Sequence, residues 1–284
     1  MARIAVVTDS DASLPASLAV RHGITVVPIN VHFGDEVFES EVDIDDEQLF
    51  VRVQREGVLP TTSAPTPGQF AKAYQAAFDA GAEQVICLCV SSLVSGTYNA
   101  ALNGRDLVRG GEVTVVDTRS LSIGQGFMTL AAARVANAGG SVAEAVSAAE
   151  DVGGRVGLYG ALATLKYLAM SGRVGSVAAG MANLLNIKPI LTLRDGKLDM
   201  LEKVRTHHRA LERVQELVRV AAAGRAIEQM AVIHVCAKGE AQELAAHLRT
   251  ALECPEEIIV ASFTAGLSVH TGPGMLGVGF VAGA

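Results

Sequence analysis

Short apolar runs alternate with longer amphipathic stretches along the first half of the chain. The runs have the length and branched side chains of buried strands, and the stretches repeat their apolar positions with the period of a helix. Predicted strands cover residues 4–7, 24–31, 84–90 and 113–116, and predicted helices cover 15–21, 69–80, a segment ending near 108, and 127–138. Strands that alternate with helices in this way predict a parallel sheet with helices on its faces, an α/β fold.

The pattern changes near residue 155. A further helix within 141–154 ends on two glycines, and a chain of 284 residues is long for one compact core. Beyond it, predicted strands cover residues 157–163, 187–193, 198–204, 231–235 and 258–262, and a predicted helix covers 207–222. We therefore expect two domains, an α/β domain over residues 1–155 and an α+β domain over 156–284 with a mixed or antiparallel sheet.

Hydroxyl-rich loops lie next to the predicted strands of the first domain. They cover residues 61–68, 91–98 and 117–126, and each follows a strand or precedes a helix. In open parallel sheets, ligands bind in the crevice beyond the carboxyl ends of the strands. The sequence therefore predicts a ligand site at this edge of the sheet.

Composition narrows the class of protein. Half of the residues are apolar, but only 4% are aromatic and none is tryptophan, so we expect an aliphatic core. The net charge of −7 argues against a general nucleic-acid binder. The acidic residues between 35 and 47 do not follow calcium-loop spacing and are interpreted as a solvated loop and a helix start. The cysteines form no C-x-x-C pair, so no metal site is expected.

The cysteines and the start of the chain bear on cellular location. All four cysteines are expected to be reduced, with Cys87 and Cys89 on one face of a strand. The chain meets Asp9 and Asp11 too early for the apolar core of a signal peptide. The uncharged stretch 258–284 contains glycines, a proline and a histidine, so stable membrane insertion is not expected. These features predict a cytoplasmic protein.

Positive charge is concentrated between residues 155 and 213. Ten lysines and arginines stand there against four acidic residues, in a protein whose net charge is −7. A solvated face is the ordinary explanation for such a stretch. The alternative is a docking site for a phosphate or an acidic partner.

The segment 263–280, F-T-A-G-L-S-V-H-T-G-P-G-M-L-G-V-G-F, contains three glycines with the spacing G-x-G-x-x-G. A dinucleotide site needs a helix after this motif and an acidic residue about 20 positions further on. Only seven residues follow Gly277, and none of them is acidic. The chain also lacks the phosphate-loop motif G-x-x-x-x-G-K-[ST]. The sequence therefore contains neither of these nucleotide motifs.

Other chemical interpretations of this segment remain open. On an extended strand, Ser268 and His270 would lie side by side, as a hydrolase nucleophile and base do, but an orienting acid and an oxyanion hole cannot be assigned. Alternatively, His270 and Thr271 donate hydrogen bonds to a carboxylate or phosphate, and the glycines let backbone amides approach the same anion. A histidine that only bonds a backbone carbonyl is the third possibility.

Eight short motifs occur in one order along nearly the whole chain. They are V-V-T-D-S (6–10), T-S-A-P-T (62–66), S-S-L-V-S-G-T-Y (91–98), V-V-D-T-R-S-L-S-I-G-Q-G (115–126), L-K-Y-L-A-M-S-G-R-V (165–174), I-K-P-I-L (187–191), V-R-T (204–206) and V-H-T-G-P-G-M-L-G-V-G-F (269–280). Together they resemble the DegV family of two-domain fatty-acid-binding proteins, whose bacterial members serve as lipid-presenting subunits of fatty acid kinase. The shared order makes this resemblance specific.

The resemblance implies a long-chain fatty acid bound in a cleft between the domains. Its carboxylate is implied to bind on three loops, at Thr62, Ser63, Ser95, Gly96, His270 and Thr271. Hydroxyl and amide groups suit this task because a carboxylate has several lone pairs to satisfy. The family often has a glutamine after its T-S pair, where this chain has Ala64, which puts a headgroup contact from that position in question.

The resemblance also implies a binding subunit that is not an enzyme by itself and needs no cofactor. Arg173 of the G-R motif and Arg205 of the V-R motif are implied to work with a separate kinase subunit, which carries the ATP site and forms the acyl phosphate. Two alternatives are kept. One is a serine hydrolase that uses Ser95 or Ser268 with His270, and the other is a lipid carrier or sensor without a kinase partner.

Overall fold

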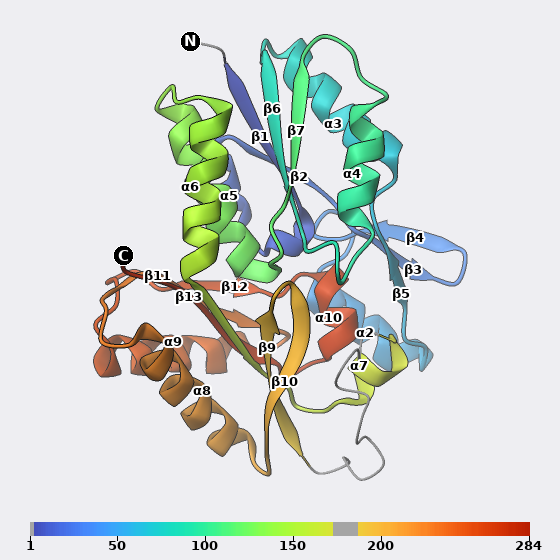
Figure 1. Ribbon diagram of the computed structural model, residues 1–284. Helices are drawn as coiled ribbons and strands as arrows, with labels where there is room; N and C mark the ends of the chain where they lie inside the picture. The colour runs from blue at the N-terminus through green and yellow to red at the C-terminus, as the bar shows by residue number, and fades with distance from the viewer. Residues whose placement is uncertain (1–2, 173–186) are drawn as a thin grey trace. The chain divides into compact units, whose positions relative to one another are not determined.

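The computed structural model describes residues 3–172 and 187–284 (Figure 1). The chain divides into two compact units. Unit 1 comprises Met1–Asp43 and Thr62–Gly154, and unit 2 comprises Ile44–Thr61 and Arg155–Ala284. The sequence suggested one boundary near residue 155, whereas the chain also enters unit 2 between residues 44 and 61. Each unit is therefore built from two separate parts of the sequence.

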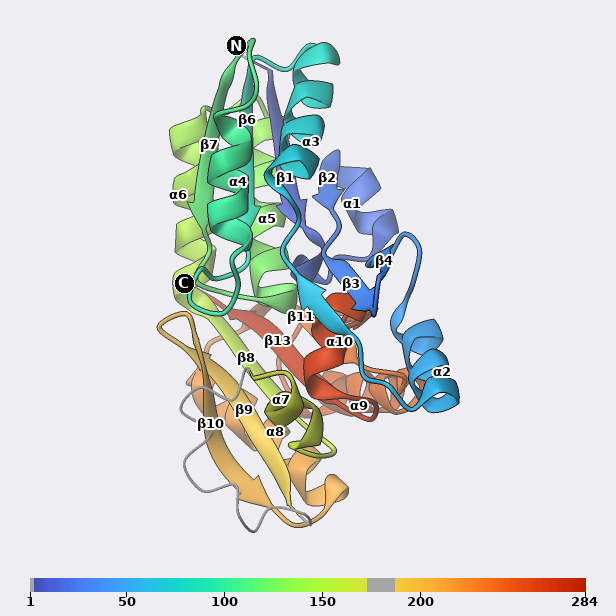
Figure 2. The ribbon, with the colours of Figure 1, turned by 90° about the vertical axis from the view of Figure 1, so that its right-hand side faces the viewer.

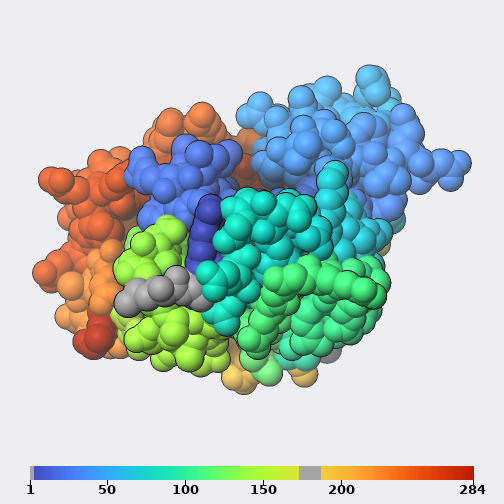
Figure 3. Space-filling model, turned by 90° about the horizontal axis from the view of Figure 1, so that it is seen from above, coloured from blue at the N-terminus to red at the C-terminus, as the bar shows by residue number. Residues whose placement is uncertain are grey.

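Unit 1 is built on a four-stranded parallel sheet with the strand order β2-β1-β6-β7. Its strands are β1 (Ile4–Asp9), β2 (Ile24–Val27), β6 (Gln84–Cys89) and β7 (Glu112–Asp117). Its helices are α1 (Ala16–His22), α3 (Pro67–Asp79), α4 (Thr97–Arg105), α5 (Ser122–Asn137) and α6 (Val142–Arg155). α3 and α4 cover one face and α5 and α6 the other, so that the start of β1 lies between them in Figure 3. The predicted α/β fold is confirmed.

The core of unit 1 joins small strand side chains to the aromatic rings of α3. Val7, Val85 and Cys87 are fully buried and pack in one cluster with Phe70 and Tyr74. Cys87 and Cys89 are both free and buried. Their thiols are 3.6 Å apart, so the two side chains share a face of β6 as predicted. This packing fixes the strand from which the loop at residues 91–96 emerges.

α5 begins at Ser122, earlier than the predicted start at residue 127. Glycines in its first turns interrupt the helical pattern that would have revealed the true start. One of them has a packing role, because a Cβ at Gly126 would lie 2.7 Å from the carbonyl oxygen of Ala12. Ala12 ends a short 3-10 helix, η1 (Ser10–Ala12), which follows β1. Gly126 therefore lets α5 lie directly against the turn after β1.

A small second sheet in the N-terminal part has the order β4-β3-β5. Its strands are β3 (Asn30–Phe33), β4 (Glu36–Glu39) and β5 (Thr61–Ser63). The expected solvated loop after residue 35 is wrong at β4, where Val31 pairs with Phe38 and the rings of Phe33 and Phe38 meet edge to face. The expected helix start there is correct, since α2 (Asp46–Glu56) begins with a capping box of Asp45 and Gln48.

Unit 2 contains a six-stranded mixed sheet with the order β10-β9-β8-β13-β11-β12. Its strands are β8 (Val156–Ala161), β9 (Lys188–Arg194), β10 (Lys197–Val204), β11 (Ile227–His234), β12 (Ile259–Ser262) and β13 (Leu276–Ala282). β11 and β12 pair in parallel, and the other neighbours are antiparallel. The predicted mixed sheet of an α+β domain is therefore confirmed.

Two long helices cover one face of this sheet, α8 (His207–Ala222) and α9 (Lys238–Ala251). Buried aliphatic side chains of both, such as Val214 and Leu244, pack against Val232, Val278 and other strand residues. α8 has the bounds that the sequence predicted. α9 was not predicted.

Three shorter helices of unit 2 pack together: α10 (Ala265–Thr271), α7 (Lys166–Met170) and α2. Figures 1 and 2 show α10 and α7 on the opposite side of the sheet from α8 and α9. The rings of Phe50 and Tyr167 meet edge to face between α2 and α7. The buried Asp46 accepts a hydrogen bond from the backbone N–H of Cys236 at 2.7 Å. This bond ties α2 to the end of β11 and explains why residues 44–61 belong to unit 2.

Candidate functional site

Polar loops follow three strands of the unit 1 sheet at its carboxyl edge. The loop after β6 is tied to the loop after β7, because the Ser91 N–H donates to the Ser120 carbonyl at 2.8 Å and the Thr118 hydroxyl donates to the Cys89 carbonyl at 2.8 Å. These bonds fix the base of the loop at residues 91–96 against the loop after β7. Two of the three hydroxyl-rich loops expected at this edge, 91–98 and 117–126, are therefore linked within unit 1.

Asp117 shapes the loop after β6 from the end of β7. Its carboxylate accepts from the Ser92 hydroxyl at 2.5 Å, from the Ser92 N–H at 3.1 Å and from the Arg119 N–H at 3.0 Å. Three donors from the protein already occupy this carboxylate. Asp117 is therefore a structural group that positions the loop.

Ser95 and Gly96 lie together in the turn that leads into α4. The half-buried Ser95 side chain has its Oγ 2.8 Å from Thr97 Oγ1 and accepts the Thr97 N–H at 3.3 Å. Gly96 is exposed, its φ is −77°, and a Cβ there would meet no described atom within 4 Å. Neither backbone strain nor packing among the described residues requires glycine at this position. A ligand that approaches the backbone closely would supply the reason.

Thr62 and Ser63 lie on β5. Thr62 is half-buried and Ser63 is exposed, and the Ser63 Oγ lies 2.8 Å from Nε2 of His32 on β3. Asn30, two residues earlier on β3, donates from its amide to the carbonyl of Ala64 at 3.2 Å. β3 therefore holds the T-S-A segment through two side chains, and neither was anticipated from sequence.

His270 and Thr271 form the last turn of α10. His270 is half-buried, and Thr271 is buried with its hydroxyl unpartnered among residues 3–172 and 187–284. The turn that follows is fixed at Gly274, whose N–H donates to the carbonyl of Val235 at 2.9 Å. Gly272 has a φ of +77°, and a Cβ there would overlap the ring of Tyr167. The glycines of the H-T-G-P-G motif therefore serve the turn and its packing.

Two further hydroxyls lie along α10. Thr264 precedes the helix and Ser268 is in it, both are buried, and neither side-chain oxygen has a hydrogen-bond partner in the described part of the chain. Ser268 and Thr271 are three residues apart in α10, which places them on one side of the helix, and Thr264 directly precedes it. Such hydroxyls can donate to a ligand or to ordered water. Sequence reasoning missed Thr264, although the T-x-x-x-S-x-x-T spacing was there to be read.

The hydrolase geometry proposed for Ser268 and His270 is wrong. These residues lie on helix α10 and not on an extended strand. Residues two apart on a helix point in different directions, and no described side chain, that of His270 included, hydrogen-bonds to the Ser268 hydroxyl. Ser268 is therefore not activated as a nucleophile by His270.

A buried carboxylate underlies the loop after β6. Asp9, the last residue of β1, accepts from the N–H of Asp11 at 3.0 Å and from the N–H of Val90 at 2.9 Å. Burial raises its pKa to about 6, and these hydrogen bonds oppose the rise. Gln125 of α5 donates to the Thr8 hydroxyl beside it at 3.0 Å. Asp9 therefore connects the ends of two neighbouring strands directly below the polar loops.

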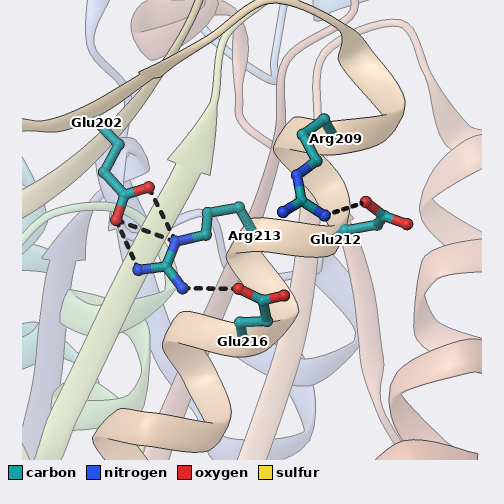
Figure 4. A network of polar contacts seen from close by, with 5 residues as sticks. All are labelled: Glu202, Arg209, Glu212, Arg213 and Glu216. Atoms are coloured by element: carbon teal, nitrogen blue, oxygen red, sulfur yellow. Dashed lines mark hydrogen bonds and ion pairs between the residues drawn. The ribbon is translucent and has the colours of Figure 1, made fainter.

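Part of the basic stretch of unit 2 forms ion pairs within the unit. Arg213 binds Glu202 through two nitrogens and Glu216 through a third, and Arg209 binds Glu212 (Figure 4). Arg213 also holds the pKa of Glu202 below its usual value through these hydrogen bonds. Arg155 and Arg194 also form ion pairs, with Glu228 and Asp199, so four of the ten cations of this stretch are paired among the described residues.

The two predicted partner-contact arginines are Arg205 and Arg173. Arg205 is exposed, directly after β10, and has no ion pair with an acidic residue in the described part of the chain. Arg173 lies outside the described residues. Arg205 is thus a cation available on the surface of unit 2.

The described residues also bear on metals and membranes. In residues 3–172 and 187–284, no three His, Cys, Asp or Glu side chains gather as they would around a metal ion. Within the same ranges, every helix is too short or too polar to cross a membrane.

The chain is similar to known proteins over its whole length. The family described as "Uncharacterised protein, DegV family" matches residues 3–283. A DegV domain-containing protein from Streptomyces coelicolor is 39% identical over 279 residues, which cover 97% of each chain. This similarity spans all eight motifs.

Two solved structures share the fold. A DegV family protein from Thermus thermophilus, described for its fatty acid binding, has a TM-score of 0.91 and 31% identity, and the match covers 99% of both chains. DegV from Bacillus subtilis, described as a fatty acid binding protein, has a TM-score of 0.90 and 30% identity, and the match covers 100% of both chains. The chain therefore belongs to the DegV family.

Proposed function

We propose that this protein binds a long-chain fatty acid and presents its carboxylate to a separate kinase subunit, which forms the acyl phosphate. The observation that carries the proposal is the likeness over the complete chain to two solved DegV proteins that are described as binding fatty acids. Both are at least 30% identical to this chain. Likeness of this extent supports the same class of ligand.

The carboxylate is proposed to bind Thr62, Ser63, Ser95, Gly96, His270 and Thr271. An ionised carboxylate only accepts hydrogen bonds and offers about four lone-pair positions, so hydroxyls, amides and imidazole N–H groups are suitable partners. The buried hydroxyl of Thr271 has no partner among the described residues, and the backbone of Gly96 is open to approach. Both features support a ligand oxygen at these positions.

The acyl tail is proposed to supply most of the binding free energy. Each buried methylene contributes about 0.8 kcal/mol, so ~15 of them contribute roughly 12 kcal/mol before the costs of association. Half of this chain is apolar and only 4% is aromatic. Small and branched aliphatic side chains of this kind suit a narrow tunnel for an alkyl chain.

The phosphoryl donor is proposed to come from the partner subunit, because the sequence contains neither a phosphate loop nor a dinucleotide motif. Arg205, exposed and unpaired within the described residues, is proposed to act at that encounter together with Arg173. The same proposal places the reaction in the cytoplasm. The basic stretch around Arg205 would otherwise be an ordinary solvated face.

Mass spectrometry of the purified protein tests the binding proposal. We expect a fatty acid in the organic extract of the denatured protein, or uptake of an added fatty acid by protein stripped of lipid. Thr271→Val, which removes a hydroxyl with little change of shape, should retain less ligand than the wild type. The matched control is Thr250→Val, at an exposed threonine of α9, which should retain as much. A wild type without extracted or added fatty acid contradicts the proposal.

The alternatives give different results with the same protein. A serine hydrolase would turn over acyl esters and lose that turnover in Ser95→Ala. A carrier or sensor would bind fatty acid but capture no ATP-binding partner in a pull-down from its own cells. Fatty acid binding without ester turnover, together with acyl phosphate formation in the presence of a captured kinase, is the result that we expect.

A further inference from the structure

A histidine on β3 meets one of the proposed carboxylate ligands. His32 Nε2 lies 2.8 Å from the Ser63 Oγ, within unit 1. The His32 side chain is half-buried, and Ser63 is exposed. The following inference rests on the proposed function, because Ser63 matters here as a carboxylate ligand.

The direction of this hydrogen bond decides what Ser63 can offer to a ligand. A serine hydroxyl has one hydrogen and two lone pairs. If Nε2 of a neutral imidazole accepts, the Ser63 hydrogen points at His32 and no donor remains for a carboxylate. If Nε2 carries a hydrogen, as in one neutral tautomer and in the imidazolium, His32 donates to Oγ and the Ser63 hydrogen is free.

The surroundings of His32 keep the pair in place. Asn30, on the same face of β3, bonds the Ala64 carbonyl at 3.2 Å and the side chain of Gln69 at 3.3 Å. The antiparallel register places Val37 of β4 opposite His32 and Glu39 opposite Asn30. Glu39 is therefore the charged group of β4 on this face, and it accepts from the Gln69 amide at 3.0 Å.

The other two residues of β5 are Thr61 and Thr62, so this strand places no charged side chain near His32. Glu39 is the neighbouring charged group, and its carboxylate is held by the Gln69 amide. The Nε2 that meets Ser63 can carry a hydrogen in a neutral tautomer, without any charge on the ring.

We propose that His32 is a positioning residue that sets the direction of the Ser63 hydrogen bond. A bound fatty acid carboxylate then selects the imidazole with a hydrogen on Nε2, and the chain runs from the ring N–H to the Ser63 oxygen and from the Ser63 O–H to the carboxylate. Hydrogen bonds that end on a charged group are stronger than neutral ones, so this polarity favours binding. By linkage, carboxylate binding and the donating state of His32 stabilise each other.

The test measures the affinity for cis-parinaric acid, a fluorescent fatty acid, in titrations of the full-length protein. His32→Leu should weaken binding about tenfold, the size of one lost hydrogen bond to a charged group. His32→Gln, whose amide can still donate at a similar position, should stay within about threefold of the wild type. In a Ser63→Ala background, His32→Leu should change nothing further. The matched control His247→Gln, at an exposed histidine of α9, should bind as the wild type does.

A ligand without a carboxylate separates hydrogen-bond direction from mere packing. Cis-parinaric acid methyl ester, which has no carboxylate, should be insensitive to His32. A wild type that does not bind cis-parinaric acid overturns the proposed function. If the wild type binds and His32→Leu binds equally well, this inference alone is overturned. The same holds if His32→Leu loses as much affinity in the Ser63→Ala background as in the wild type.

Discussion

At the scale of the single residue, the chemistry of Asp9 depends on its burial. Its carboxyl is inaccessible to solvent and yet accepts two backbone N–H bonds, from Asp11 and Val90. Burial raises its pKa to about 6 from a usual value of 3.8. Between these two values the folded protein binds a proton that the unfolded chain does not, so rising pH lowers the free energy of unfolding.

We expect this effect to be measurable by denaturation at pH about 4 and about 7. A shift of about two pKa units corresponds to on the order of 3 kcal/mol, lost as pH rises through this window. Asp9→Asn should be less stable at both pH values, since its amide cannot accept both N–H bonds, but should lack this part of the pH dependence. An unchanged slope in Asp9→Asn would contradict the assignment.

Gly96 is the second residue with a specific expectation. A Cβ there would meet no described atom within 4 Å, and its φ of −77° is open to any residue. Gly96→Ala should therefore leave the melting temperature unchanged or slightly raised, because alanine loses less backbone entropy on folding. If a carboxylate approaches the backbone here, the same change should weaken fatty acid binding about tenfold or more. Calorimetric titration with a fatty acid checks this, and equal affinity would remove Gly96 from the site.

At the scale of elements, α3 and α4 pack closely at one glycine. A Cβ at Gly104 would lie 2.7 Å from the Phe70 Cβ and 2.8 Å from the Pro67 carbonyl oxygen, so backbone would have to move. Tyr74 adds a hydrogen bond from α3 to the Ala101 carbonyl of α4 at 3.3 Å. This contact holds the helix that begins directly after Ser95 and Gly96.

Gly104→Ala should therefore destabilise the protein by about 1–3 kcal/mol, the usual cost of overpacking. Gly154→Ala is the matched control, because Gly154 is an exposed residue of α6 whose Cβ would meet open space among the described residues. The control should stabilise by about 0.5–1 kcal/mol through helix propensity. Urea denaturation measures both, and equal stability of the two variants would refute the close packing.

Elements with a strong pattern were predictable, and those defined by distant partners were not. α8 has the predicted bounds because its apolar positions follow one helical face and pack on the sheet. β4 was missed because its acidic, exposed residues resemble a loop, and only pairing with β3 makes them a strand. α10 was missed because glycine and β-branched residues weaken its helical signal, while packing against α7 and α2 favours the helix.

At the scale of the whole molecule, the separation of binding from partner contact can be tested. His270→Ala should lower the amount of fatty acid that copurifies, because it removes a proposed carboxylate ligand. Arg173→Ala should retain the ligand but impair acyl phosphate formation with the kinase, and Arg205→Ala should behave in the same way. Lipid extraction with mass spectrometry and a phosphorylation assay measure the two properties. Equal loss of fatty acid in all three variants would contradict this separation.

The sequence by itself determined the family, the α/β and α+β fold classes and the aliphatic core. These follow from motif order, periodicity and composition, which are local or summed properties of the chain. Only the tertiary structure decided that residues 44–61 join unit 2, that Ser268 and His270 lie on a helix, and that His32 meets Ser63. Each of these depends on contacts between residues far apart in sequence or on packing that overrides weak local preference, and a single sequence does not encode such pairings in a form that can be read locally.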